Sequence, residues 1–390
     1  MWRRFVVSGI AVFSLLAVAC GGEPTEEEAL DATEPATEAG DEASPAPGPG
    51  SPGSPAQGSP ASPGGVAGVL ASLEGMERDE RRAQLIDMAA EEGASVTIYT
   101  SLNTENLDVL AEVFAEDTGV ALLSYRAAAE DVRTRVLEEA QANRLQPDVV
   151  AIGDSRMVPL VDEDLLAPYT SPYQEDLVEG AVQDFWTLIR FNLYAVAWNT
   201  DLVAEGEQPT SFEDLADPKW DGRMTMEPSD ADWYWSVSDY LESDLGYSEE
   251  EVTEYWEQLT DGSDFNSGHT STNQLLLAGR YAIFTSAFSR SIEQEKLDGA
   301  PVEWRPPVEP LFATPEAAAI IEQTSRPATA ILLMDWLIDE GQDVMAELQI
   351  DVTRADLSDL GDAEVRFVDA YEWAEVEADV IAEYEALSGA

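Results

Sequence analysis

Hydrophobic positions recur in a regular order from residue 72 onward. Stretches with apolar residues every three or four positions, typical of amphipathic helices, alternate with short apolar runs typical of buried strands. The first helices are expected over 82–92, 107–119 and 131–143, and the first strands over 95–100, 120–125 and 147–153. This β-α-β-α-β order predicts an α/β fold with a parallel sheet and helices on both of its faces.

The pattern continues into a second group of elements. A long strand is expected over 191–199, a strand over 221–227, helices over 233–241, 249–260 and from Thr270, and strands over 281–286 and 302–305. Thr314, Pro315 and Glu316 have the composition of a helix start, with a threonine cap followed by proline in the first turn. Further helices are expected from there to residue 387.

Ligands of parallel α/β sheets bind outside the carboxyl ends of the strands, in the loops that lead into helices. Topology alone therefore predicts where a site lies. The candidates in these loops are Thr100, Ser101 and Asn103 after the first strand, residues 126–130 after the second, and Asp154 and Ser155 after the third.

Charge and rare residues exclude several functions. The 390 residues carry 78 Asp and Glu against 20 Lys and Arg, a formal charge of −58, so nucleic acid is excluded as a partner. One cysteine forbids an internal disulfide, and one histidine leaves little for a histidine-based metal site. The acidity fits either solubility at high salt or a bias toward arginine codons. An anchored carboxylate-dependent hydrolase remains an alternative, although no G-x-S-x-G motif is present.

The first 71 residues predict export and anchoring. Residues 1–20 have a basic start and an apolar run too short to span a bilayer, as in a lipoprotein signal peptide. Small residues precede Cys20, which we expect to be lipidated; the alternative is ordinary cleavage after Ala19. Residues 21–71 are acidic and then rich in Pro, Gly and Ser, which predicts a disordered tether. We therefore expect a protein held by a lipid at the outer face of the cytoplasmic membrane or in the periplasm.

Several short segments, taken in order, resemble a known family. They are VTIYTS (96–101), PDVV (147–150), LAPY (166–169), YAVAWNT (194–200), PTSFEDL (209–215) and DPKWDGR (217–223). The ordered set resembles the bacterial extracellular solute-binding proteins of ABC importers, in the two-lobed type II class, and most closely its ferric-iron, phosphonate and sugar-phosphate binders.

The resemblance implies a binding protein that does no chemistry. Lobe 1 would comprise residues 72–196 and 303–390, and lobe 2 residues 197–302, joined by crossover strands near 194–198 and 302–305. A solute would bind in the cleft and pass to an ABC permease in the membrane. A monomer with no cofactor is expected.

The ligand remains open among three classes. Iron binders of this family use tyrosines after the returning strand of lobe 2, where this chain has Ser286, Phe288 and Ser289. An oxyanion such as a phosphonate or sugar phosphate is favoured instead, because hydroxyls precede a predicted helix N-terminus. Its candidates are His269, Thr270 and Ser271, with Arg126, Arg156 or Arg290 as the countercharge.

Two further interpretations apply to the same residues. The hydroxyl groups are also plain helix caps, which is their commonest role. An organic cation is the third ligand class, held by Asp230 and Asp232 with the aromatic Trp233 and Tyr234.

Overall fold

A computed structural model of the protein describes residues 64–358 and 363–389. The predicted signal peptide, Cys20 and nearly all of the predicted tether lie outside these residues. Within the described part of the chain, no helix combines the length and apolar character needed to cross a bilayer.

The first sheet forms as the periodicity predicts. Strands β1 (Ser95–Thr100), β2 (Ala121–Arg126) and β3 (Val149–Gly153) are parallel, and helices α3 (Thr104–Thr118) and α4 (Ala129–Gln141) connect them. The strand order is β2-β1-β3-β10-β5. These strands and helices confirm the predicted α/β class. Because β1, β2 and β3 are parallel, their carboxyl ends place the loops after β1 and β3 at one edge of the sheet.

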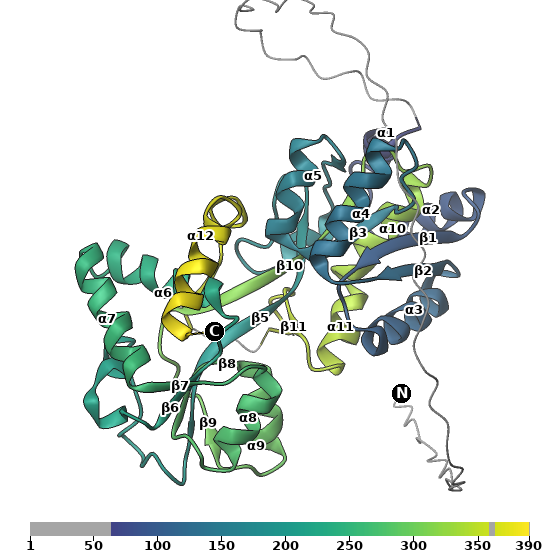
Figure 1. Cartoon of the computed structure of the whole chain (residues 1–390). Helices are drawn as coiled ribbons and strands as arrows, with labels where there is room; N and C mark the ends of the chain where they lie inside the picture. Colours follow the sequence, from purple (N-terminus) through teal and green to yellow (C-terminus); the bar gives the residue numbers. More distant parts are fainter. Residues whose placement is uncertain (1–63, 359–362, 390) are drawn as a thin grey trace, which may run out of the picture. The chain divides into compact units, whose positions relative to one another are not determined.

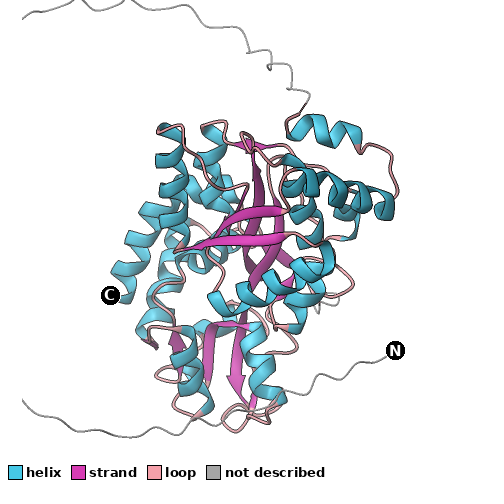
Figure 2. Ribbon diagram, turned by 90° about the vertical axis from the view of Figure 1, so that its right-hand side faces the viewer, coloured by secondary structure: helices cyan, strands magenta, loops and turns pink. Residues whose placement is uncertain are grey.

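Helices cover this sheet on both sides (Figures 1 and 2). Those outside the β1–β3 region are α1 (Val66–Ser72), α2 (Arg78–Glu91), the 3₁₀ helix η1 (Asp154–Met157), α5 (Val158–Asp162), α10 (Pro327–Leu337) and α11 (Glu340–Glu347). Helix α10 is buried along its whole length, and α1 and α2 pack on it. The chain before residue 72 gave no periodic signal, yet α1 contributes Val66 and Val69 to the core.

One long strand belongs to two sheets. In β5 (Thr187–Asn199), residues 187–193 pair with β10 (Leu311–Ile321), and the last residues pair with β8 (Ile283–Phe288) and β9 (Val302–Glu303). The expected strand over 191–199 is therefore confirmed and begins four residues earlier. Because β5 runs through both sheets, it links the two groups of elements covalently and by hydrogen bonds.

The predicted helix start at Thr314-Pro315-Glu316 is wrong. These residues lie in β10, between β3 and β5. The run from Ala317 to Ile321 is fully buried, as expected for a central strand covered on both faces. Pro315 is tolerated next to a register shift between Glu316 and Ala317. The cap pattern is a local preference, and pairing with two neighbouring strands overrides it.

The second sheet has the order β5-β8-β6-β7, with β6 (Met224–Met226) and β7 (Ser263–Phe265) parallel. Helices α6 (Ala231–Ser243), α7 (Glu249–Asp261) and α12 (Ala370–Ser388) contribute to one hydrophobic core, rich in aromatic residues. Helices α8 (His269–Leu277) and α9 (Ser289–Leu297) contribute to another (Figure 1). The remaining short strands are β4 (Leu166–Ala167), β11 (Asp351–Val352) and β12 (Val365–Phe367).

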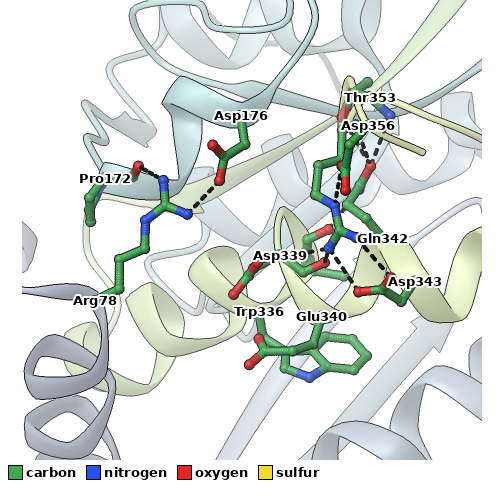
Figure 3. Close-up of polar contacts among 12 residues, drawn as sticks. Arg78, Pro172, Asp176, Trp336, Asp339, Glu340, Gln342, Asp343, Thr353 and Asp356 are labelled. Carbon is green, nitrogen blue, oxygen red and sulfur yellow. Dashed lines mark hydrogen bonds and ion pairs between the residues drawn. The ribbon is translucent and has the colours of Figure 1, made fainter. Parts of the chain in front are cut away.

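The start of α11 is held by a dense polar network (Figure 3). The Gln342 side chain is fully buried; its Nε2 donates to the carbonyls of Ile189 and Leu337, each at 2.8 Å. Its Oε1 accepts from the backbone N–H groups of Thr353 and Arg354, at 2.8 and 3.0 Å. Every hydrogen-bonding position of the amide is used, so Gln342 joins α11 to β5 and to the chain after β11.

Gly341 precedes this glutamine, and we expect Gly341→Ala to destabilise the protein. A Cβ at this position would lie 2.8 Å from the carbonyl oxygen of Trp336 and 3.0 Å from its ring. Overpacking of this kind costs about 1–3 kcal/mol. Urea unfolding measures it, with Gly64→Ala as the control because its added Cβ meets nothing within 4 Å. Equal stabilities of the two variants would contradict the expectation.

Candidate functional site

The loop after β1 is occupied mainly by local hydrogen bonds. Thr100 is buried, and its Oγ1 accepts from the N–H of Leu102 at 3.1 Å. Asn103 caps α3 by accepting from the N–H of Asn106 at 2.8 Å. Ser101 donates to Glu316 Oε2 at 3.2 Å. The interpretation of these groups as caps and turns therefore describes Thr100 and Asn103, whereas Ser101 reaches the long strand β10.

Asp154 opens η1 at the end of β3 and is buried. Burial raises the pKa of its carboxyl to about 8, and the nearby carboxylates of Asp369 and Glu316 add to the rise. It lines a cavity of about 300 Å³ with Trp186, Tyr371 and other residues. Ser155 accepts from Arg156 at 3.1 Å. This end of β3 is acidic; the nearby positive charges are Arg156 and Arg190, and Arg190 pairs with Glu316 at 2.7 Å.

Each of the three candidate arginines has a partner among the described residues, and that of Arg290 is Asp351, at 3.1 Å. Arg156 forms an ion pair with Glu377 of α12 and approaches Glu130 at 3.4 Å. Arg126 is exposed, and its Nε donates to the carbonyl of Leu102 at 3.3 Å. Arg290 alone of the three lines a cavity beside one of the predicted hydroxyl-rich loops.

That cavity, of about 290 Å³, lies along the N-terminal halves of α8 and α9, extends to Glu295 in α9, and includes Gln349, which follows α11. It is lined by Thr270, Asn273, Arg290, Ser291, Gln294, Glu295 and Gln349. Neither helix has a side-chain cap at its N-terminus. Ser271 donates instead to the carbonyls of Ser267 and Gly268. The exposed hydroxyl of Thr270 and the first N–H groups of both helices therefore lack a side-chain acceptor.

Two side chains in this α8–α9 cavity have unused polar capacity. Asn273 is only 4% exposed, and its Oδ1 has no hydrogen-bond partner among the described residues. The Nε of Arg290 lies 3.1 Å from Asp351 Oδ1, without the alignment of a hydrogen bond. The Arg290 guanidinium and the two uncapped helix N-termini favour an anionic group, whereas the Asn273 Oδ1 is an acceptor and needs a donor. Glu295 also lines this cavity, and its carboxylate opposes the binding of an anion.

The residue before Thr270 belongs to a second polar cluster. His269 Nε2 lies 3.0 Å from Asp230 Oδ1, and the His269 ring stacks on Phe288 at 3.7 Å. Burial raises the pKa of Asp230 to about 6, and the contact with His269 opposes this rise. Tyr194 donates to Asp232 at 3.0 Å. The cluster therefore combines carboxylates and rings at the junction of α6, α8, β8 and the shared strand β5.

Several oxygens in this cluster lack partners among the described residues. They belong to Glu227, Asp230 and Ser286, all at most 3% exposed. A buried polar atom without a partner costs about 1–3 kcal/mol, so such atoms mark places where water or a ligand binds. Ser286, which sequence reasoning selected, is joined here by Glu227, which it missed because nothing local distinguishes one acid among 78 acidic residues.

Trp233 and Tyr234 have a structural role. Trp233 is 1% exposed and packs on Trp256 at 5.6 Å. Tyr234 stacks on Tyr384 at 5.0 Å, and its hydroxyl donates to Glu383 at 2.8 Å. Both rings hold α12 and α7 against α6. The rings next to the acidic cluster are those of His269, which stacks on Phe288, and of Tyr194, whose hydroxyl donates to Asp232; sequence reasoning did not select Tyr194.

No group of three or more His, Cys, Asp or Glu residues suited to holding a metal occurs in residues 64–358 and 363–389. Phe288 and Ser289 stand at the end of β8 and the start of α9, where the family's iron binders have tyrosines.

Two α/β sheets that share a long strand, with helix N-termini and buried polar groups near their junction, define a periplasmic-binding-protein fold of type II. Residues 110–349 match the family of bacterial extracellular solute-binding proteins. The chain belongs to this family, whose members serve ABC importers.

Relatives of known structure share the fold at low sequence identity. Iron-bound HitA from Pseudomonas aeruginosa is 17% identical, with a TM-score of 0.56 over 74% of this chain and 99% of that one. AfuA from Actinobacillus pleuropneumoniae, with fructose-6-phosphate bound, is 20% identical, with a TM-score of 0.57 over 76% and 98%. The Fe(3+)-binding periplasmic protein of Serratia marcescens is 22% identical over 161 residues, 40% of this chain and 46% of that relative. This chain therefore aligns with about half the length of that relative.

Proposed function

We propose that this protein captures a small solute bearing an oxyanion and delivers it unchanged to an ABC permease. Phosphonates and sugar phosphates are the ligand classes. Lipidation of Cys20 and the long polar segment after it would keep the binding protein close to the permease, at a high effective concentration.

The α8–α9 cavity carries this proposal. Its lining includes Thr270 and Arg290, the second residues of α8 and α9, and neither helix N-terminus has a side-chain cap; the positive ends of the two helix dipoles and the Arg290 guanidinium are therefore close to it. Such a concentration of donors is notable in a chain of charge −58, because any anion that binds must be attracted locally against the charge of the whole. Closure of the lobes around the anion would then be stabilised by contacts from both sides.

Ferric iron is the second candidate, and relatives named for iron binding support it. The residues at the end of β8 do not, because Phe288 and Ser289 offer no phenolate oxygen. A thermal unfolding panel of the metal-stripped protein separates the two candidates. It contains inorganic phosphate, propylphosphonate, fructose 6-phosphate and ferric iron with carbonate. A ligand at 100 times its Kd stabilises by about 2.7 kcal/mol. Stabilisation by ferric iron alone would overturn the oxyanion proposal.

Arg290→Met should weaken binding of whichever oxyanion stabilises the protein. A hydrogen bond to a charged group contributes about 1.5–3 kcal/mol, so we expect a loss of affinity of about ten- to a hundredfold in isothermal titration calorimetry. Arg280→Met is the matched control, since Arg280 is exposed on the same lobe and pairs with Asp264 at 2.9 Å. If both variants bind the anion as the unmodified protein does, the α8–α9 cavity is not the site.

A further inference from the structure

Three buried oxygens near the start of α6 have no hydrogen-bond partner among the described residues, and their residues do not line the α8–α9 cavity. Glu227 is 1% exposed, Asp230 is 3% exposed and Ser286 is fully buried. Each has an oxygen with no hydrogen-bond partner: Oε2 of Glu227, Oδ2 of Asp230 and Oγ of Ser286. Two of these three oxygens are carboxylate acceptors. The Ser286 hydroxyl is near enough to Asp230 to lower the pKa of that carboxyl by hydrogen bonding, so the partner that remains missing, above all for Glu227 Oε2, is a donor.

The charges of this cluster point the same way. Within residues 64–358 and 363–389, neither Glu227 nor Asp230 forms an ion pair with lysine or arginine, and His269 is the one ion-pair partner of Asp230. The Glu227 side chain accepts a hydrogen bond from the Ser229 hydroxyl, which lies 3.1 Å from Oε1. Asp232 is satisfied by the hydroxyls of Tyr194 and Thr314. Buried carboxylates held mainly by neutral groups attract a cation.

Aromatic rings complete the surroundings of these acids. The rings of Phe288 and His269 stack at 3.7 Å, and the ring of Tyr194 lies 5.5 Å from that of Phe288. A ring face attracts an ammonium group through its quadrupole, and the attraction grows when water is excluded. The combination of acids and rings suits an organic ammonium better than a hydrated inorganic cation.

Chain connectivity places this acidic cluster next to the α8–α9 cavity. His269 is bonded to Thr270, which lines the cavity, and Phe288 lies two residues before Arg290. We propose that the ligand is zwitterionic, with its oxyanion in the α8–α9 cavity and an ammonium group against Asp230 and Glu227. This inference rests on the proposed function for its anionic half, and it narrows the ligand class to small aminophosphonates, amino acids and similar compounds.

Matched pairs of ligands test the ammonium half by calorimetry. The first probe is 3-aminopropylphosphonate, compared with propylphosphonate, which lacks the ammonium, and with propylamine, which lacks the oxyanion. Homologues of two and four carbons cover other spacings between the charges. We expect the best aminoalkylphosphonate to bind at least about tenfold more tightly than its alkylphosphonate, since a charge-assisted hydrogen bond contributes at least that factor.

Variants of Asp230 and Glu227 test whether these carboxylates cause the tighter binding of the aminoalkylphosphonate. Asp230→Asn should abolish the preference for the aminoalkylphosphonate over the matching alkylphosphonate, that is, bring the ratio of the two affinities close to one. Glu227→Gln is the second variant and gives the same readout if Asp230→Asn does not fold. Glu254→Gln, an exposed position on α7, should keep the full preference.

The outcomes separate the two proposals. Equal affinities for the amino and plain phosphonates at every chain length overturn the ammonium site and leave the oxyanion proposal standing. Tight binding of propylamine without a gain from the phosphonate overturns the oxyanion proposal and leaves the ammonium site standing. A preference that survives both Asp230→Asn and Glu227→Gln overturns the assignment to this cluster.

Discussion

Replacing Arg81 by methionine is expected to destabilise the protein by about 3–5 kcal/mol, more than any other single exchange discussed above. Arg81 is 4% exposed, and its guanidinium binds Asp335 in a bidentate manner, with Nε–Oδ2 at 2.6 Å and Nη2–Oδ1 at 3.1 Å. Tyr169 donates to the same carboxylate at 2.6 Å. Methionine would leave Asp335 charged and buried between α2 and α10, with only the tyrosine as a donor. Urea unfolding measures the loss.

Two further variants show whether the loss of stability in Arg81→Met comes from the buried ion pair. Arg78→Met removes an ion pair with Asp176 whose side chains are 38% and 45% exposed, so it should cost no more than about 1 kcal/mol. The double variant Arg81→Met with Asp335→Leu should recover much of the stability, because no charge remains buried without a partner. If Arg81→Met costs no more than Arg78→Met, the ion pair is not a major part of how α2 is held.

Asp154→Asn is expected to stabilise the protein by an amount that increases with pH. The folded-state pKa of Asp154 is raised to about 8, against about 3.9 in an unfolded chain. Between these values the folded state holds a proton that the unfolded state has lost. The Asp154 contribution to stability is therefore fully present below about pH 4, falls by up to about 1.4 kcal/mol per pH unit, and levels off above about pH 8.

Thermal unfolding at pH 5, 7 and 9 tests this sign. The melting temperature of Asp154→Asn relative to the unmodified protein should rise from pH 5 to pH 7 and rise further, by a smaller amount, from pH 7 to pH 9. Asp108→Asn, an exposed position on α3, should show no such trend. A difference that is constant with pH would mean that Asp154 titrates normally, and that its carboxylate is solvated through the cavity beside Trp186.

The sequence determined the elements of the first sheet and brought two of the predicted loops to one edge of it. Strands β1 to β3 and the helices between them follow from apolar periodicity, and parallel pairing brings Ser101 and Asp154 to the same sheet edge. The start of α8 near Thr270 was also predictable, because a glycine and polar residues precede an apolar run. These features depend on neighbours in the chain, which the sequence displays directly.

The tertiary structure alone decided which polar groups matter. Only pairing with β3 and β5 makes Thr314 and Glu316 part of a strand rather than the start of a helix. Thr270 and Asn273 come together with Arg290 only because α8 and α9 pack side by side. Glu227 and Asp230 differ from the other acids only in losing water and finding few partners, since burial is a property of the packed chain. The local sequence indicates which secondary structure a residue prefers. Packing of distant segments decides whether its polar group is buried and which partners it finds.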